Sequence, residues 1–502
     1  MIIKDLTTLK KFFQERVNFP IFGAGVYAFH RLGPDDFLPD YRILALRRSL
    51  EGELIKKDIE VLFIEKSLGK KHILEPRNAT TVLKLKKTRK YLEKFKNNPG
   101  GINILVYKTS LKMEKICKEN NWRLIAPSAR FGKKFLENKI NFRRILEELK
   151  VPVPPGKIVS IKNLHYGHLM NKYGLPFVIQ HPTKGGGKGT FFIYCKEDFE
   201  KVYKNLKKPV KEEFEEKEEK PAKEVIVAKY IQGPSPSLTG CVTRYGILST
   251  NLQHQILDIP ELYNPEKGSG LFCGHDWASS NFSEEINQQA YEIVNKVGNY
   301  FKSLGYKGIF GLDFVLDEET KKLYVTETNP RLLGSFPTIS MIQVYNNEPP
   351  ILAFHILEYL NIDYQIDLET INQQMRKKKP GAQMILHNLT GKWSKIKKTL
   401  KAGIYQLDNN KLKYLRPGYK FQHLKNDSEF LLTEGILVKG SPLSPNRRLG
   451  RVITQSSVLQ DYNQLNSWGK TVAETTYQSF KIKPVRFIKI KKFFKPHFLA
   501  KG

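Results

Sequence analysis

Two acidic residues, an amide and an arginine lie close together in GIFGLDFVLDEETKKLYVTETNPRLLGS, residues 308–335. The segments GLDFVLD and KLYVTETNP are predicted to form a β-hairpin through the turn-prone DEETKK. Side-chain alternation puts Glu327 and Asn329 on one face of the second strand, and Asp313 can project towards them from the first. Carboxylate and amide oxygens suit Mg²⁺ held between a protein and nucleotide phosphates. Arg331, two residues further on, is well placed to stabilise a transferring phosphoryl group.

A glycine-rich loop between two predicted strands is the second candidate for chemistry. It lies in LPFVIQHPTKGGGKGTFFIY, residues 175–194, where PFVIQ enters the loop and TFFIY leaves it. Glycines let backbone amides approach a polyphosphate closely, and Lys184 and Lys188 add positive charge. A strand follows the loop, whereas a Walker A loop opens a helix. The pattern therefore predicts a flap over phosphates, with a mobile surface turn as the alternative.

Two further segments carry weaker signals. EVIVAKYIQG, residues 224–233, is a hydrophobic strand that enters a polar linker, and the backbone from Ala228 to Ile231 could meet an adenine ring. Any buried strand gives a similar pattern. LYNPEKGSGLFCGHDWASSN, residues 262–281, is expected to be a glycine-rich loop that lines an acceptor site. His275 and Asp276 are its polar candidates, and a structural role for this histidine is the alternative.

The N-terminal third predicts an α/β layer that would support these segments. Strand-like and helix-like segments alternate in it, which is typical of a partly parallel sheet. FGAGVYAF near the start resembles a dinucleotide loop but lacks a third glycine and a clear preceding strand, so a nucleotide site there is not favoured. The strands are predicted at 41–46, 59–65, 103–110 and 123–128, with a helix at 111–120.

Proline-marked junctions divide the rest of the chain. A basic helix, FLENKINFRRILEELK, ends at VPVPPG, and the mixed-charge segment 207–224 is predicted to be a solvated loop. RKKKPG at 376–381 precedes a region with strands predicted in GAQMILHN, AGIYQL, EGILVKG and LGRVIT. The tail RFIKIKKFFKPHF, 486–498, is expected to be a surface strand or frayed end rather than a contact for nucleic acid or membrane.

Composition limits the class of protein. A chain of 502 residues predicts about three domains. The net charge of +33 would suit a polyanionic partner, but the lysines are spread over every region and no nucleic-acid-binding motif accompanies them, so nucleic acid is not the favoured partner. Four scattered cysteines, no apolar run long enough to span a membrane and no signal-peptide pattern predict a cytoplasmic protein.

Taken in order, Lys139 in ENKINFRRIL, the GGGKG flap, the AKYI hinge and the DF…ETNPR pair resemble ATP-grasp enzymes. The resemblance covers about 136–360 closely. It implies an α/β and α+β chain with an N-terminal α/β pre-ATP-grasp domain over 1–135. An ATP-grasp domain over 136–360 would contain a flap subdomain at about 160–235. A small β-rich C-terminal domain over 361–502, with a basic tail, resembles the closing domain of biotin-carboxylase-like members.

The resemblance also implies roles for particular residues. Asp313, Glu327 and Asn329 would coordinate Mg²⁺, for which Mn²⁺ could substitute, and Arg331 would contact the γ-phosphate or acyl phosphate. Gln180 stands where the family usually has a lysine that touches the phosphates, and Ala228 stands where an acidic residue often holds the ribose. The implied ATP contacts come from Lys139, Gln180, Lys184, Gly186, Gly187, Lys188, Ala228, Lys229, Tyr230 and Ile231.

The function that this resemblance implies is an ATP-dependent ligase, which activates a carboxylate as an acyl phosphate and couples it to an amine. Amino acids or short peptides are the expected small-molecule substrates. A bicarbonate-activating enzyme like biotin carboxylase is one alternative, and a non-catalytic ATP- or nucleic-acid-binding protein is another. The oligomeric state stays open, with a homodimer as one option.

Overall fold

The N-terminal region contains a five-stranded sheet in which every neighbouring pair is parallel. In spatial order its strands are β3 (Val61–Phe63), β2 (Tyr41–Ala45), β1 (Ile21–Gly25), β4 (Ile102–Leu105) and β5 (Trp122–Ile125). The helices of this region are α1 (Leu6–Arg16), α2 (Leu50–Ile55), α3 (Ala79–Lys84), α4 (Lys86–Leu92) and α5 (Leu111–Glu119). These parallel strands and their helices confirm the predicted α/β layer.

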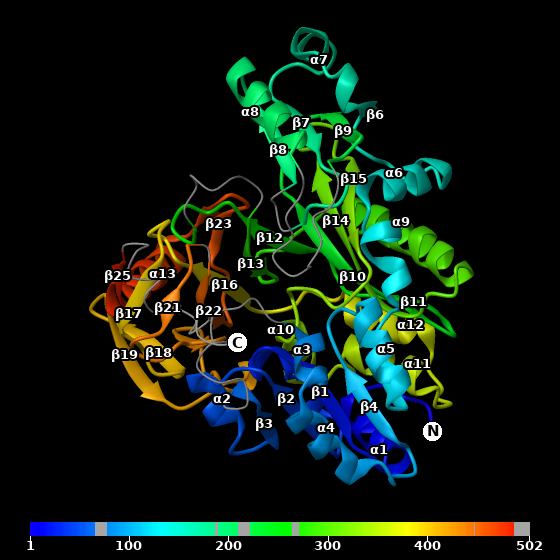
Figure 1. Ribbon diagram of the computed structural model, residues 1–502, viewed down its shortest axis with the longest axis vertical. Coiled ribbons are helices and arrows are strands. Elements are labelled where there is room, and N and C mark those ends of the chain that lie inside the picture. Colours follow the sequence, from blue (N-terminus) through cyan, green and yellow to red (C-terminus); the bar gives the residue numbers. More distant parts are fainter. Residues whose placement is uncertain (66–77, 186–188, 209–220, 264–270, 446, 486–502) are drawn as a thin grey trace, which may run out of the picture.

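The computed structural model describes residues 1–65, 78–185, 189–208, 221–263, 271–445 and 447–485 (Figure 1).

The glycines of FGAGVYAF lie inside the central strand β1 and do not form a loop. A Cβ added to Gly23 would come within 1.9 Å of the Tyr41 hydroxyl oxygen, which itself donates a hydrogen bond to the Arg31 carbonyl. Gly23 therefore makes room for a neighbouring strand's side chain, which is a packing role.

An antiparallel sheet of four strands forms the flap, which projects at the top of Figure 1. Its order is β6 (Gly156–Ser160), β9 (Glu224–Lys229), β7 (Phe177–Gln180) and β8 (Thr190–Ile193). The helices α7 (Tyr166–Tyr173) and α8 (Lys196–Leu206) cover it, and α6 (Lys139–Glu148) precedes it. The predicted strands on both sides of the glycine loop are confirmed and pair with each other from Phe177–Ile193 to Gln180–Thr190.

One long sheet connects the centre of the chain to its C-terminal region. Its antiparallel pairing of β13 with β16 crosses the expected domain boundary at 360/361. In order, the strands are β15 (Leu323–Asn329), β14 (Gly308–Leu316), β10 (Pro236–Thr243), β12 (Gln253–Leu257), β13 (Phe272–Asp276), β16 (Ala382–His387), β22 (Arg448–Thr454), β20 (Glu429–Thr433), β18 (Gly403–Asp408) and β19 (Lys411–Arg416), while β11 (Gly246–Ser249) pairs with β10. The sheet therefore fixes the C-terminal region relative to the centre.

Helices and small sheets pack against this long sheet. The central helix α9 (Glu284–Ser303) shares a hydrophobic core with β10 and β14 through residues such as Val294 and Leu312. The other helices are α10 (Thr338–Tyr345), α11 (Ile351–Leu360), α12 (Leu368–Arg376) and α13 (Ser467–Ser479), and the remaining strands are β17 (Ser394–Lys398), β21 (Pro442–Leu443), β23 (Leu459–Asp461), β24 (Gln464–Leu465) and β25 (Lys481–Pro484). No helix within the described ranges is long and apolar enough to cross a membrane. The four cysteines are free thiols.

Two expectations from the sequence are wrong. EGILVKG, 434–440, is not a strand, because β20 ends at Thr433 and the next two residues, Glu434 and Gly435, both have φ of 68°. Left-handed backbone does not continue a strand. The expected loop at 262–281 contains strand β13, while 264–270 lies outside the described residues. Most of the predicted mixed-charge loop and the basic aromatic tail also lie outside them.

Candidate functional site

The predicted hairpin is confirmed, and it brings the acidic and amide side chains together. Asp313 of β14 lies directly opposite Glu327 of β15, and Gly311 lies opposite Asn329. The Asn329 side-chain amide donates a hydrogen bond to one Asp313 oxygen at 2.9 Å. Arg331 in turn donates to the Asn329 side-chain oxygen at 2.7 Å. Hydrogen bonds therefore link three of the four predicted side chains, and strand pairing places Glu327 beside Asp313.

Lys139 joins this network to the flap. The Asn138 side chain caps α6, so Lys139 lies at the first position of the helix and is only 4% exposed. Its Nζ lies 2.7 Å from an oxygen of Glu327 and donates a hydrogen bond to the Lys184 carbonyl at 3.2 Å. Its backbone N–H donates to the Pro182 carbonyl at 2.9 Å. One ammonium group thus touches both the glycine-loop segment and the acidic hairpin.

Three residues of this network were missed by the sequence prediction. Gln255 of β12 donates to the second Asp313 oxygen at 3.0 Å. Glu137 accepts from Arg331 at 3.2 Å and from Lys108 at 2.5 Å, so it holds the arginine beside the hairpin. Glu137 is two residues before Lys139 in the same motif, which was an available signal. Nothing in the local sequence marks Gln255 or Lys108.

Burial controls the ionisation of these carboxyl groups. Burial raises the pKa of Asp313 to about 7, the Glu327 charge adds to this rise, and Arg331 and Lys139 oppose it. Burial also opposes ionisation of Glu137, but Arg331 and Lys108 outweigh it and hold the pKa of Glu137 below its usual value. A cation placed at the hairpin would relieve the repulsion between the two paired acids.

The side-chain oxygens at the hairpin suit a hard divalent cation whose coordination shell is completed by another ligand. Two carboxylates and one side-chain amide lie at the hairpin, where the amide nitrogen faces Asp313 and the amide oxygen faces Arg331. Even with this oxygen turned towards a metal, the hairpin offers fewer than the six or more oxygens that Mg²⁺ needs. Among the described residues, no group of three or more His, Cys, Asp or Glu side chains could hold a metal by itself. Phosphate oxygens and water would therefore have to complete the coordination.

Gln180 and His181 lie where strand β7 enters the glycine loop of the flap. The side-chain amide of Gln180 lies 3.5 Å from the Thr190 hydroxyl across the β7–β8 pair. The His181 ring accepts hydrogen bonds from the backbone N–H groups of Thr183 and Lys184 at 3.3 and 3.4 Å, which shapes the start of the loop. Burial lowers the pKa of His181 to about 4. The predicted contacts Gly186, Gly187 and Lys188 lie outside the described residues.

The hinge continues from β9. Ala228 lies between Gly156 of β6 and Val178 of β7, and the Lys229 backbone N–H donates to the Pro155 carbonyl at 2.8 Å. The Tyr230 ring packs edge-on against Phe192 of β8, with 5.7 Å between the ring centroids, and Ile231 is 8% exposed. The linker is thus held against the flap.

The two candidates for an acceptor site have structural partners, although His275 lies directly opposite Gln255 across the β12–β13 pair. Asp276 is fully buried, and its carboxylate accepts hydrogen bonds from the backbone N–H groups of Ser279, Val458 and Leu459 at 2.8 to 3.1 Å. These contacts use the carboxylate to hold the C-terminal segment, so the acceptor role of Asp276 stays a prediction and a structural role accounts for its burial. His275 is 4% exposed and 2.9 Å from the Gln383 amide, and burial lowers its pKa to about 3.

Comparison with known proteins identifies the central region. The ATP-grasp domain family matches residues 136–335, so this chain carries an ATP-grasp domain. The carbamoyl phosphate synthase large chain of Clostridium perfringens (strain SM101 / Type A) is 23% identical over 314 residues, which are 61% of this chain and 26% of that protein. The formate-dependent phosphoribosylglycinamide formyltransferase of Prochlorococcus marinus is 26% identical over 182 residues, 34% of this chain and 41% of that one. The chain spans about a quarter of the length of the synthase relatives.

Solved structures share the fold over nearly the whole chain. The biotin carboxylase domain of 2-oxoglutarate carboxylase from Hydrogenobacter thermophilus, in complex with MgADP, ADP and bicarbonate, has a TM-score of 0.56 at 14% identity. The match covers 93% of this chain and 91% of that one. N5-carboxyaminoimidazole synthase from Aspergillus clavatus has a TM-score of 0.50 at 12% identity, covering 87% and 94% of the two chains. The fold is therefore the ATP-grasp fold with an N-terminal α/β domain and a β-rich C-terminal region.

Proposed function

We propose that this protein is an ATP-dependent ligase that activates a carboxylate as an acyl phosphate and couples it to an amine. The observation that carries the proposal is the position of Lys139, whose ammonium contacts both the Lys184 carbonyl and Glu327. An ammonium between a glycine-rich loop and paired acids can neutralise a polyphosphate that lies between the flap and the hairpin.

The roles proposed for single residues follow from this placement. Asp313, Glu327 and Asn329 would hold Mg²⁺ (or Mn²⁺), which would supply charge neutralisation for the phosphates when bound. Lys139 would then exchange its contact with Glu327 for one with phosphate. Arg331, kept in place by Glu137, would contact the phosphoryl group during transfer. The chain's share of catalysis is positioning and charge stabilisation, with no covalent step on the protein.

ATP binding would use the flap and the hinge together. The backbone from Ala228 to Ile231 would meet the adenine ring, including Lys229 and Tyr230. Lys184, with the loop residues Gly186, Gly187 and Lys188, would close over the phosphates. Gln180 can donate a hydrogen bond to phosphate but carries no charge, so we propose that Lys184 supplies the cation that the strand lacks.

The carboxylate substrate has two candidates. An amino acid or short peptide remains our first choice. Bicarbonate is the second candidate. The fold match with a biotin carboxylase domain solved in complex with bicarbonate covers 93% of this chain. As part of the proposal, residues 1–135 and 361–502 would enclose the substrates around the ATP-grasp domain.

The test is a screen for ADP formation by the full chain with Mg²⁺ and ATP. One arm supplies pooled amino acids and dipeptides, and the other supplies bicarbonate with the same amines. Glu327→Gln keeps the side-chain shape but removes the charge, so it should abolish ADP formation in whichever arm is active. Glu319→Gln, on the exposed turn of the same hairpin, is the matched control and should keep full activity. Equal ADP formation by the Glu327→Gln variant and the wild type would refute the proposal.

A further inference from the structure

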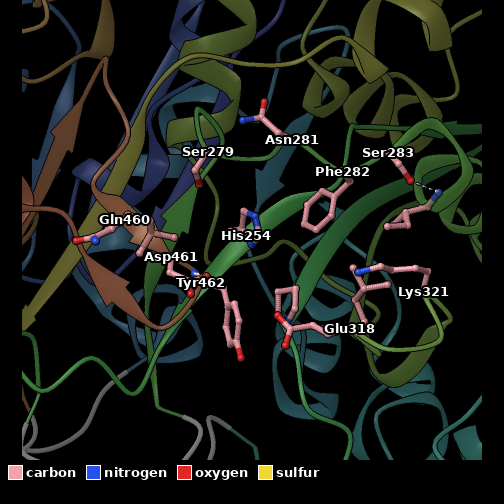
Figure 2. A pocket seen from close by; sticks show the side chains of 14 residues that line it. His254, Ser279, Asn281, Phe282, Ser283, Glu318, Lys321, Gln460, Asp461 and Tyr462 are labelled. Carbon is pink, nitrogen blue, oxygen red and sulfur yellow. Dashed lines mark hydrogen bonds between the residues drawn. The ribbon is translucent and has the colours of Figure 1, made fainter.

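A cavity separate from the phosphate network lies where the central helix meets the C-terminal region. Its volume is about 340 Å³, within the size range of small-molecule sites. The start of α9, strand β12 and the β23–β24 hairpin contribute to its walls. Figure 2 shows His254 and Phe282 on one wall, while Tyr462 extends from the hairpin towards Glu318.

The cavity is on the opposite face of the long sheet from the proposed ATP phosphates. Gln255 points towards the hairpin network, because it donates to Asp313. Its neighbour His254 must point to the other face, since successive side chains of a strand alternate. Leu316, which also lines the cavity, belongs to the core under α9. A ligand here would therefore not share space with the phosphates.

Two residues that line this cavity each carry a buried polar atom with no hydrogen-bond partner in the described part of the chain. The two atoms are Nδ1 of His254 and Oγ of Ser279. Buried polar atoms are nearly always satisfied, so two unsatisfied groups in the wall of one cavity indicate a missing partner, which the imidazole ring and the hydroxyl group would reach by turning towards the cavity. Burial lowers the pKa of His254, although Asp276 and Asp461 oppose the shift, and the ring is therefore neutral near pH 7.

Aromatic rings and the charge of the rim define the ligand class. The His254 and Phe282 ring centroids are 4.6 Å apart, and Tyr462 offers another ring surface. Rings of this kind stack well on planar bases. Among the described residues, the rim carries the carboxylates of Glu318 and Asp461 and the ammonium of Lys321, and this balance disfavours a phosphate group. We infer that this cavity binds a neutral heteroaromatic base or nucleoside.

The cavity is also connected to the hinge. Pro234 lines it, and the Pro234 carbonyl accepts a hydrogen bond from the Leu316 backbone N–H at 2.9 Å. The Glu318 N–H donates to the Gln232 carbonyl at 3.2 Å. Occupancy is therefore expected to change ATP affinity by about fivefold or more, as two coupled sites do. This coupling rests on the proposed function, whereas binding of the nucleoside does not.

Calorimetric titration of the full chain tests the inference without requiring turnover. Adenosine, guanosine, cytidine and uridine are each compared with the corresponding 5′-monophosphate. At least one nucleoside should bind saturably, and about tenfold more tightly than its monophosphate. Tyr462→Ala and Ser279→Ala should each weaken binding about tenfold, as loss of a stacking ring or a buried hydrogen bond does.

Two controls keep this result separate from the ATP site. Ser303→Ala, at the exposed far end of α9, should bind like the wild type. Lys139→Met should also bind the nucleoside normally, since it alters only the proposed phosphate site. Absence of nucleoside binding, stronger binding of the monophosphate, indifference to both cavity variants, or loss of binding in Lys139→Met would each overturn the inference. Loss of ADP formation alone would count against the proposed function and leave this binding site intact.

Discussion

Two buried lysine–glutamate pairs in this protein have nearly the same geometry but different surroundings. Lys139 and Glu327 are 2.7 Å apart, and Lys379 and Glu348 are 2.8 Å apart. Both lysine side chains are almost fully buried, at 3% and 0% exposure. Glu327 is 27% exposed and lies opposite another acid, whereas Glu348 is 9% exposed. The neighbourhood of a pair, and not its distance, separates a candidate site from a structural contact.

The second pair is enclosed by further hydrogen bonds. Lys379 also donates to the Gln374 carbonyl at 2.9 Å, and Glu348 accepts from Asn346 at 3.2 Å. Burial lowers the pKa of Lys379 and raises the pKa of Glu348, and each charge opposes the shift of the other. Both groups are less exposed than Glu327, so this pair is less open to a ligand than the pair at the hairpin. This comparison gives the predictions below, in order of decreasing effect.

Lys379→Met should destabilise the protein strongly and leave its chemistry unchanged. Removing one partner of a buried ion pair leaves the other charge uncompensated, which costs roughly 3–5 kcal/mol. Urea unfolding should show this loss, while ADP formation per folded molecule stays at the wild-type level. Lys377→Met, at an exposed neighbouring position, should change stability by less than about 0.5 kcal/mol. A Lys379→Met variant as stable as the wild type would contradict the structural role.

Lys139→Met should reduce activity strongly and stability less, which is the reverse of the result expected for Lys379→Met. Loss of a cation at a phosphoryl-transfer site should reduce the rate of ADP formation by about 10²–10³-fold, as loss of one preorganised donor does. Stability should fall less than in Lys379→Met, because Glu327 is partly exposed and can be solvated. Steady-state kinetics and urea unfolding measure the two effects. Lys134→Met, on the exposed side of the preceding turn, is the control, and equal activity in both variants would remove Lys139 from the site.

Lys184→Ala should weaken ATP binding by about ten- to a hundredfold, because a charge-assisted contact to phosphate contributes about 1.5–3 kcal/mol. Gln180→Lys should then be nearly neutral, since the site already has its cation. Calorimetric titration of ATP into the two variants measures both effects. The opposite pattern, with little effect at Lys184 and tighter binding in Gln180→Lys, would mean that phosphate binding has decayed.

The smallest effect, counted per pH unit, concerns a histidine outside the network. Nδ1 of the fully buried His355 accepts a hydrogen bond from the Ile309 N–H at 3.0 Å, and burial lowers its pKa to about 3. The unfolded chain, with a usual histidine pKa of about 6.5, binds this proton more readily. The stability contribution is therefore complete above about pH 6.5, and it falls by about 1.4 kcal/mol per pH unit as the pH drops towards the folded pKa.

His355→Gln keeps an acceptor for Ile309 but cannot titrate. Urea unfolding between about pH 6 and pH 4 should show a slope smaller by about 1.4 kcal/mol per pH unit than in the wild type. His168→Gln, at an exposed position in the flap, should leave the slope unchanged. An unaltered slope in His355→Gln would show that this imidazole is not held neutral.

The sequence predicted strands and hairpins correctly where side-chain alternation and turn-forming residues occur together within a short segment. The hairpin of Asp313 and Glu327, the strands beside the glycine loop and four of the five strands of the N-terminal sheet were predicted from local pattern. The central strand β1, whose glycines resemble a loop, was missed. The same reasoning failed at EGILVKG, whose alternation resembles a strand. There Glu434 leaves the strand with left-handed backbone and pairs with His30 and Arg448 at 2.9 and 2.7 Å. Buried charge pairing across distant segments outweighs local propensity.

The sequence by itself therefore determined the kinds of groups present: paired acids with an amide, a lysine-bearing glycine loop, and an α/β region ahead of them. Only the tertiary structure decided which of them meet. Arg331 contacts Glu137 across 194 residues of sequence, and Gln255 contacts Asp313 across 58. The tertiary structure also buries the side chain of Asp276 and leaves that of Glu327 partly exposed. Periodicity is a property of neighbouring residues, whereas burial and long-range pairing depend on how the whole chain packs, so no local pattern contains them.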